Sequence, residues 1–368
     1  MLTRRVITFG PMRIPPLVFA LLSVLGTVGG GALECTPPKE AYQQQHGAEL
    51  YGRMCAVCHG MNGEGYKADQ APAIGHSDFL ASASDEFLHR TISEGRPGTT
   101  MSAWGFEHGG PLHATDVDAT ITFLRTWQKD APFTLDERPL IGDVAAGRKI
   151  FAQECARCHG DRGTGGQYVA IGGAQFLSRA SNGFLRRAIT AGRRGTAMPA
   201  FEGTLDDVSI DHVIALLRQW QHEAPPTAFQ HAMPARPPPI PLGPVPLNPH
   251  GPEPIGFDAQ PKTTKAAVVK RELDRGAKMA ILDARAPSDY MRQHIAGSVS
   301  VPFYDPSPYV SELPRDAWLV CYCSCPHAES GQLASKLMAE GFKKVTVLDE
   351  GLGFWSSHGF PTRTGLDP

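Results

Sequence analysis

The stretch Cys55-Ala-Val-Cys58-His59-Gly60 recurs 100 residues later as Cys155-Ala-Arg-Cys158-His159-Gly160. Further along, Gly95-Arg-Pro-Gly-Thr-Thr-Met101 recurs as Gly192-Arg-Arg-Gly-Thr-Ala-Met198. The same residue types therefore return in the same order at similar spacing. One structural unit has been duplicated within the chain.

Each copy of the unit ends in apolar residues at helical spacing, at Val117–Trp127 and Val208–Trp220, and a similar pattern lies near its start. Gly-rich connections separate the two helical segments. The pattern predicts two small all-α domains whose first and last helices cross, with Gly47 and Gly147 allowing close approach of aromatic side chains such as Phe123, Trp127 or Trp220. Domains of roughly 80–90 residues need additional core material, which a buried prosthetic group would supply.

The repeated cysteine motif has a direct chemical interpretation. Two thiols three residues apart lie on one face of a helical turn, where both can add to the vinyl groups of a haem while the following His reaches the iron. A Met in a downstream Gly-rich loop then supplies the second axial ligand. We therefore predict two covalently bound haem c groups. The predicted haem-binding cysteines are Cys55, Cys58, Cys155 and Cys158, and the predicted iron ligands are His59, Met101, His159 and Met198.

A C-x-x-C pair alone is also typical of a redox pair or half of a zinc site. A His directly after both pairs and a Met in both loops favour haem over these alternatives. Methionine in each sixth position would leave no open iron site, which disfavours a haem enzyme acting on a small molecule.

Both copies resemble class I cytochrome c domains, over residues 39–130 and 144–223. The stretch Gly195-Thr-Ala-Met198-Pro199 reproduces the Met-Pro ligand loop of that family. In the first copy Ser102 follows Met101, and this departure leaves the later His108 and His113 as alternative ligands. The resemblance implies electron transfer.

The chain has 368 residues and a formal net charge of -2, so it has no global basic field and we expect no nucleic-acid partner. Basic residues near the N-terminus precede the uncharged stretch Ile14–Leu33, which predicts an export signal or membrane anchor over residues 1–35. Cys35 resembles the acylated residue of a lipoprotein signal, although Glu34 departs from that pattern. We expect a periplasmic or extracytoplasmic protein, held at a membrane by an uncleaved helix or by lipid on Cys35.

Composition divides the rest of the chain. The predicted domains are residues 39–130 and 140–223, followed by a Pro-rich linker at 224–262 and a C-terminal domain at 263–368. In the last of these, short apolar runs at 278–283, 317–322 and 344–348 alternate with helical patterns at 268–274 and 331–340. Alternating strands and helices predict an α/β domain with a mostly parallel sheet. The fold class is multidomain, with two small all-α domains and one α/β domain.

The α/β region resembles the rhodanese family over residues 264–361. The resemblance lies in Ile281-Leu-Asp283-Ala-Arg285, Leu319-Val-Cys-Tyr-Cys323 and Val347-Leu-Asp-Glu-Gly351. It implies a cysteine at a strand end whose thiolate or persulfide is stabilised by backbone N–H groups. The strand pattern favours Cys323 as the nucleophile, with Cys325 as the alternative or as a resolving thiol.

The loop at 324–330 lacks the Arg that many thiosulfate-using members carry, and Glu329 would disfavour an anionic donor. A neutral or protein-bound persulfide donor therefore fits better than thiosulfate. Two functions stay open. The first is a dihaem electron carrier whose rhodanese-like domain handles sulfane sulfur. The second is a pure electron-transfer protein whose rhodanese-like domain is a non-catalytic binding module. Either would exchange electrons with a redox protein, a donor or acceptor of a respiratory chain.

Five arginines lie between Ser178 and Gly195, and no acidic residue lies among them. The stretch could dock an anionic redox partner, hold haem propionates or form a solvated helix face.

Overall fold

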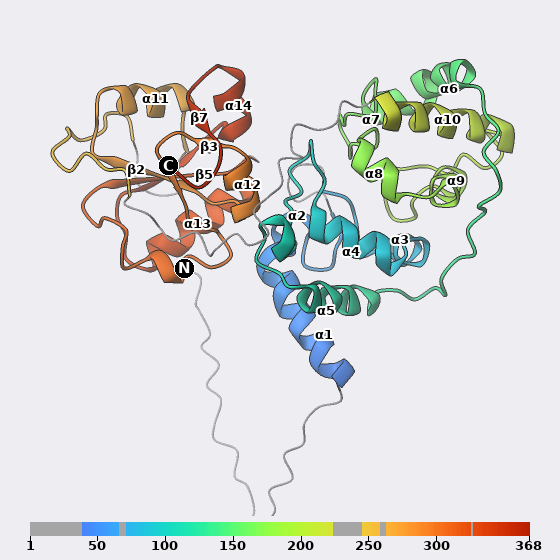
Figure 1. Ribbon diagram of the computed structural model, residues 1–368, viewed down its shortest axis with the longest axis horizontal. Coiled ribbons are helices and arrows are strands. Elements are labelled where there is room, and N and C mark those ends of the chain that lie inside the picture. The colour runs from blue at the N-terminus through green and yellow to red at the C-terminus, as the bar shows by residue number, and fades with distance from the viewer. Residues whose placement is uncertain (1–38, 66–70, 224–244, 258–262, 325–326) are drawn as a thin grey trace, which may run out of the picture. The chain divides into compact units, whose positions relative to one another are not determined.

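The computed structural model describes residues 39–65, 71–223, 245–257, 263–324 and 327–368 (Figure 1). The predicted export segment, Cys35, the first part of the Pro-rich linker and Cys325 lie outside the described residues. Within the described part, no helix is both long and apolar enough to cross a membrane.

The first copy of the repeat folds as a helical domain, here called helical domain 1. Its elements are α1 (Lys39–Leu50), the π-helical turn η1 (Tyr51–Cys55), α2 (Ala56–His59), α3 (Ser77–Ser82), α4 (Asp85–Glu94), the short η2 (Phe106–His108) and α5 (Ala114–Arg125).

The second copy, helical domain 2, repeats this order. Its elements are α6 (Val144–Ile150), the π-helical turn η3 (Phe151–Cys155), α7 (Ala156–His159), α8 (Ala174–Arg179), α9 (Asn182–Ala191) and α10 (Asp207–Glu223). The helix before each ligand loop, α4 or α9, begins with a serine cap, since Ser84 and Ser181 each accept from a backbone N–H three residues on.

The first and last helices of each helical domain cross at a glycine, as the sequence predicted. A Cβ atom on Gly47 would lie 2.0 Å from the carbonyl oxygen of Ala119, and one on Gly147 would lie 2.0 Å from that of His212. The nearest neighbour is thus backbone rather than an aromatic ring, although the Cβ of Phe123 follows the backbone atoms of Ala119 at 2.9 Å from the added Cβ on Gly47. Only glycine permits so close a crossing.

Aromatic rings fill the space beside each crossing. Tyr51 meets Trp127 edge to face, with ring centroids 5.1 Å apart, and Phe151 meets Trp220 in the same way at 4.8 Å. Such pairs prefer this geometry because the positive edge of one ring faces the negative face of the other. These contacts lie directly before the two cysteine motifs and fix the direction in which the chain enters them.

The C-terminal α/β domain is built on a five-stranded parallel sheet in the order β1-β6-β5-β2-β4. The strands are β1 (Thr263–Thr264), β2 (Met279–Asp283), β4 (Ser298–Ser300), β5 (Trp318–Tyr322) and β6 (Val345–Leu348), while β3 (His294–Ile295) and β7 (Thr362–Arg363) form a separate antiparallel pair. The helices are α11 (Ala266–Asp274), α12 (Pro287–Arg292), α13 (Ala328–Ala339) and α14 (Gly351–Ser357), and the short turn η4 covers Ser307–Tyr309. The predicted mostly parallel sheet is confirmed.

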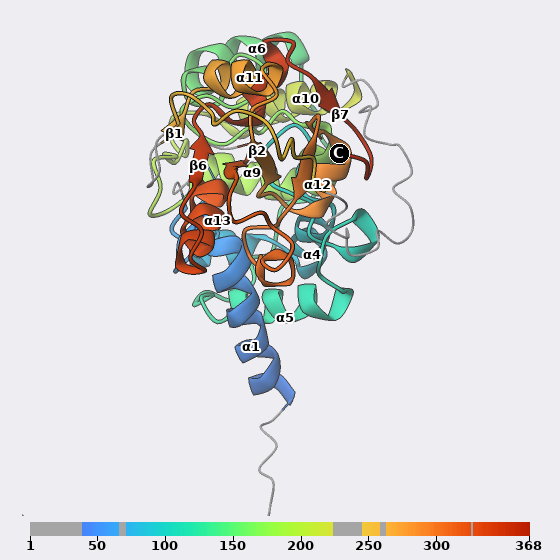
Figure 2. The same cartoon turned by 90° about the vertical axis from the view of Figure 1, so that its left-hand side faces the viewer.

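Helices cover both faces of this sheet (Figures 1 and 2). Alternate strand residues enter two separate cores: Ile281 and Val320 pack on the face with α11 and α14, while Leu282 and Cys321 pack on the other face, where α13 lies. A strand covered on both faces is apolar along its whole length, which explains the uninterrupted apolar runs in the sequence.

The second part of the predicted linker packs against the α/β domain. The amide of Asn248 donates to the carbonyl of Gly276 at 2.7 Å, and the backbone N–H of Lys278 donates to that of Pro252 at 2.9 Å. Phe257 is buried edge-on against Trp318. The segment 245–257 contains no helix or strand, yet it belongs to the core of the domain that follows it.

Gly47→Ala should lower the free energy of unfolding of helical domain 1 by about 1–3 kcal/mol, the usual cost of overpacking, because the clashing atom is a backbone carbonyl. Gly52→Ala is the matched control, since the space around Gly52 is open. A helical alanine there should be neutral or stabilising by up to about 1 kcal/mol. Denaturant titrations followed by tryptophan fluorescence would measure both. Equal free energies of unfolding for the Gly47→Ala and Gly52→Ala variants would contradict a close backbone contact at Gly47.

Candidate functional site

Each cysteine motif continues directly from the first helix of its domain. Helix α1 runs through η1 into α2, so Cys55, Cys58 and His59 lie on one uninterrupted helical segment. Gly60 ends the segment with a φ of 82°, and the hydroxyl of Tyr51 donates to its carbonyl at 2.6 Å. Helical domain 2 repeats the π-helical turn, an element that often marks functional sites.

The two motif histidines are held in one tautomer by backbone carbonyls. His59 Nδ1 bonds the carbonyl of Pro72 at 2.9 Å, and His159 Nδ1 bonds that of Val169 at 2.9 Å. A carbonyl only accepts, so each Nδ1 carries the proton and each Nε2 keeps its lone pair for a metal. This is the usual arrangement around ligating histidines. Burial lowers the pKa of His59, which further favours the neutral ring.

The two methionine loops are built by the same hydrogen bonds. In helical domain 1 the Thr99 hydroxyl donates to the carbonyl of Arg96 at 2.7 Å and accepts from the N–H of Met101 at 3.2 Å. In helical domain 2, Thr196 makes the same bonds to the carbonyl of Arg193 at 2.7 Å and the N–H of Met198 at 3.2 Å. The loops are therefore equivalent, even though only the second continues with proline.

The predicted haem residues of both helical domains line one cavity of about 680 Å³. Its described wall contains both cysteines, the histidine and the methionine of each copy, and apolar side chains make up most of the remainder. It includes neither His108 nor His113. His113 instead stacks on Phe106, with ring centroids 4.6 Å apart, at the start of α5. The geometry thus favours Met101 over the two alternatives.

These residues fit a covalently attached haem. Burial raises the pKa of Cys55 to about 12 and that of Cys155 to about 11, so both are neutral thiols in the free protein, the form that adds to a vinyl group on haem attachment. Arg96 and Arg193 line the cavity, and burial lowers the pKa of each to about 10. Arg96 Nε is buried and makes no hydrogen bond within the described residues. An unpartnered guanidinium atom beside an apolar cavity suits a haem propionate.

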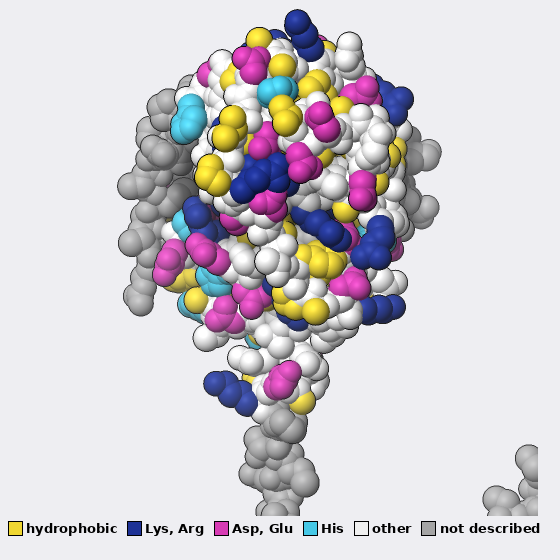
Figure 3. Space-filling view, turned by 90° about the vertical axis from the view of Figure 1, so that its right-hand side faces the viewer, with side chains coloured by type: hydrophobic (Ala, Val, Ile, Leu, Met, Phe, Trp, Pro, Cys, Tyr) yellow, Lys and Arg dark blue, Asp and Glu magenta, His cyan; other side chains and the backbone are white. Residues whose placement is uncertain are grey.

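The arginine-rich stretch 178–195 is largely internal. Three of its arginines have side chains that are at most 15% exposed and pair with acidic residues from other segments: Arg179 with Glu94, Arg186 with Asp211 and Arg193 with Asp78. On the face shown in Figure 3, basic and acidic side chains are interspersed. The arrangement favours a structural role over a docking face.

In the α/β domain, Cys323 directly follows β5, and its side chain turns toward α13. Cys323 Sγ lies 3.2 Å from Ser330 Oγ, and the carbonyl of Cys323 accepts from the N–H of Leu352 at 2.9 Å. The residue is 1% exposed. Helix α13 begins at Ala328, three residues before the predicted Gly331, because His327 closes the loop in the left-handed region with a φ of 72°.

Two features beside Cys323 bear on the expectation that its sulfur donor is not an anion such as thiosulfate. Burial, reinforced by Cys323 and Asp289, raises the pKa of Glu329 well above its ordinary range. The carboxyl therefore favours its neutral form, and the predicted repulsion of an anionic donor is weakened. Arg285, from another segment, donates to Ser324 Oγ at 3.2 Å at the start of the loop.

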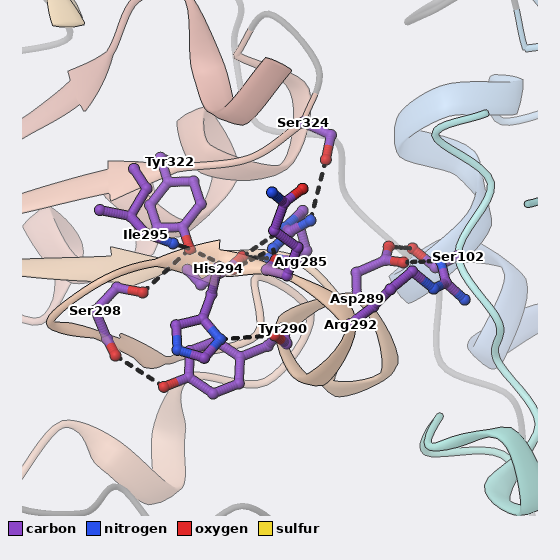
Figure 4. Close-up of polar contacts among 12 residues, drawn as sticks. Ser102, Arg285, Asp289, Tyr290, Arg292, His294, Ile295, Ser298, Tyr322 and Ser324 are labelled. Atoms are coloured by element: carbon purple, nitrogen blue, oxygen red, sulfur yellow. Dashed lines mark hydrogen bonds and ion pairs between the residues drawn. The ribbon is translucent and has the colours of Figure 1, made fainter. Parts of the chain in front are cut away.

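A buried polar network supports the strand end behind this loop (Figure 4). The hydroxyl of Tyr322 donates to Asp283 at 2.6 Å and accepts from the N–H of Ile295 at 3.1 Å. Arg285 closes the network with bonds to both carboxylate oxygens of Asp283, at 2.9 and 2.6 Å. Every one of these contacts is buried, so the network fixes the position of the residue that follows Tyr322.

Sequence reasoning missed Arg96 as a cavity residue. The signal was present, because Gly95-Arg96 and Gly192-Arg193 occupy the same place in the two repeats. It also missed the contact between Ser102 and Asp289, which lie 187 residues apart. No pattern of neighbouring residues predicts that contact.

Comparison with known proteins agrees with this geometry. Residues 43–124 and 142–217 match the family described as cytochrome C oxidase, cbb3-type, subunit III, and residues 265–358 match the rhodanese-like domain. The fold and the site thus define a multidomain c-type cytochrome. More particularly, two cytochrome c segments that match the cbb3-type subunit III family are followed by a segment that matches the rhodanese-like domain.

Individual relatives cover parts of the chain. The Cbb3-type cytochrome c oxidase subunit FixP of Bradyrhizobium sp. (strain ORS 278) is 31% identical over 199 residues, 51% of this chain and 65% of that protein. Subunit CcoP of Azospirillum sp. (strain B510) is 28% identical over 182 residues, 45% of this chain and 57% of that protein. The chain thus spans less than two thirds of these relatives. A rhodanese-like domain from Anabaena sp. is 28% identical, with a TM-score of 0.27, and covers 29% of this chain and 82% of that one.

Met101→Ala should lower one reduction potential of the haem-loaded protein, because a thioether ligand stabilises ferrous iron. His113→Ala should leave both potentials unchanged, since its ring stacks on Phe106 away from the cavity. Redox titration monitored by absorbance would measure them. If His113→Ala shifts a reduction potential and Met101→Ala does not, then His113 rather than Met101 is the ligand in helical domain 1.

Proposed function

We propose that this protein is an exported electron carrier with two covalently bound haem c groups. The observation that carries the proposal is the duplicated set of two thiols, one oriented imidazole and one thioether along a single cavity. Haem c supplies a one-electron centre there, and His/Met ligation raises its potential. The proposed attachment and ligand residues are the eight named from the sequence.

The two cytochrome c domains are joined through their cavity walls. Phe87 of α4 stacks on Phe184 of α9, with ring centroids 5.1 Å apart. Arg96 reaches from helical domain 1 to donate to the carbonyl of Ala170 at 2.6 Å, and its guanidinium lies 4.7 Å from the ring centroid of Phe176. This continuity supports electron exchange within one chain rather than two independent carriers.

Redox partners of a respiratory chain fit this proposal, because the relatives are named as subunits of a cytochrome c oxidase. An extracytoplasmic location fits as well, since the cytochrome family attaches its haem outside the cytoplasm. Membrane association through residues 1–35, by an uncleaved helix or by lipid on Cys35, belongs to the same proposal and lies outside the described residues.

The wild-type chain should keep two haems under acid–acetone extraction, because thioether bonds survive denaturation. The double variant Cys55→Ala/Cys58→Ala should keep one, and Cys155→Ala/Cys158→Ala should also keep one. Haem absorbance per chain, with intact mass, gives the count. Recovery of free haem from the wild-type chain would contradict the proposed covalent attachment.

The rhodanese-like domain is proposed to carry sulfane sulfur on Cys323. Its thiolate would attack the outer sulfur of a persulfide R–S–SH; the S–S bond of the donor breaks, the sulfur moves to Cys323, and RSH leaves. The strand-end position of Cys323 and its contact with Ser330 support this role. Cys325, outside the described residues, stays the alternative nucleophile.

One observation favours the competing function of a binding module. Cys323 is almost fully buried, and the helices beside it also contact the first cytochrome c domain. A domain used mainly to hold its neighbour would need no accessible thiol.

Incubation with glutathione persulfide should add one sulfur to Cys323, while Cys321 should stay unmodified because burial raises its pKa. Fragmentation of the peptide containing both residues locates the added mass. Cys323→Ser should abolish the addition, and a parallel incubation with thiosulfate tests the anionic donor. Sulfur found mainly on Cys325 would identify Cys325 rather than Cys323 as the nucleophile. If neither donor adds sulfur, the domain is a non-catalytic binding module.

A further inference from the structure

The loop that carries Met101 continues into a buried contact with the rhodanese-like domain. Ser102, 3% exposed, donates from its hydroxyl to Asp289 Oδ2 at 2.5 Å, as Figure 4 shows. The next residue, Ala103, accepts at its carbonyl from the Ser288 hydroxyl at 2.7 Å. Arg292 pairs with the other oxygen of Asp289 at 2.8 Å. Both residues after the predicted ligand are therefore held by α12.

Further contacts extend this interface on either side of the loop. Trp104 and Tyr304 are both buried and have ring centroids 5.8 Å apart. Helix α13 packs against α2, the helix that ends in His59. Glu329 on α13 lines the haem cavity and directly precedes Ser330, the hydroxyl next to Cys323 Sγ. The rhodanese-like domain thus supplies part of the wall of the first haem site.

In the second cytochrome c domain, the loop after the methionine is restrained in a different way. There Pro199 follows Met198, and proline restricts both its own φ and the conformation of the residue before it. Ser102 gives the first loop no such restriction. At the corresponding place in the first loop, buried hydrogen bonds to α12 hold the chain instead.

We propose that Ser288 and Asp289 of the rhodanese-like domain are positioning residues for Met101, so that this domain is a resident clamp on the first haem site. The clamp rests on the proposed role of Met101 as an iron ligand. Because the two domains are in contact, helix α13, which packs against Cys323, also reaches the haem cavity. A structural change in the rhodanese-like domain would therefore alter the ligand geometry at one of the two redox centres.

The test compares Ser102→Ala and Ser288→Ala with Ser335→Ala in the full-length, haem-loaded protein. Ser335 is exposed and bonds only within α13 among the hydrogen bonds of the described residues, so it is the matched control. Hydrogen–deuterium exchange should accelerate at residues 102–105 and 287–292 in the first two variants. Exchange at 199–202 and in α1 should not change, which separates loss of docking from general destabilisation.

Redox titration of the same samples provides the second measurement. The potential that Met101→Ala shifts should also fall in Ser102→Ala and Ser288→Ala, because a released loop admits water to the site and weakens the ligand. The other potential, and both potentials of Ser335→Ala, should stay at the wild-type values.

Unchanged exchange in both interface variants would overturn the clamp, as would faster exchange with no change in either potential. A chain that fails to retain two haems would refute the electron-carrier proposal instead. The exchange measurement would still report on the docking itself, so the two failures are distinguishable.

Discussion

The helix crossings at Gly47 and Gly147 place backbone against backbone, and the geometry of both proposed haem sites depends on them. The first helix of each domain runs without interruption into its cysteine motif, so the crossing fixes the direction of the thiols and the imidazole. A side chain at either glycine would separate the helices and turn the motif away from the methionine loop. The constraint is steric, and it acts at a distance from the chemistry.

Buried charge is the second organising feature of the helical domains. Asp78 lies within 3.7 Å of Arg193 and within 3.5 Å of Arg194, and thus joins the third helix of domain 1 to the methionine loop of domain 2. Removing the buried carboxylate of Asp78 would take away the counter-charge of Arg193, and breaking a buried ion pair costs about 3–5 kcal/mol. The pairs therefore specify how the two cytochrome c domains meet, whatever their net contribution to stability.

One edge of the sheet in the rhodanese-like domain carries both Cys323 and the contacts with the first cytochrome c domain. The carboxyl ends of the parallel strands carry Cys323 and the Asp283–Arg285 pair, which is where α/β folds place their functional groups. The helices that follow β2 and β5 also meet the first cytochrome c domain. Cys323, the proposed sulfur carrier, and the contacts with the first cytochrome c domain thus lie on neighbouring segments of this edge.

Much of the architecture follows from local patterns. The two small all-α domains, the crossing of their first and last helices and the parallel sheet were all predicted, and the three central strands begin one residue later than expected. These features succeed because thiol spacing, helical period and apolar runs are properties of neighbouring residues. The start of α13 was missed because one left-handed residue, His327, shortened the loop.

The sequence by itself determined the chemistry of the donor sets and the class of each domain. Tertiary structure alone decided which arginines are withdrawn from solvent, where His113 points, what the Ser102 hydroxyl contacts and that Glu329 borders the predicted haem cavity. Each of these depends on side chains far apart along the chain, such as Ser102 and Asp289 at a separation of 187 residues. Burial and ion pairing arise only when such segments meet, so no local pattern contains them.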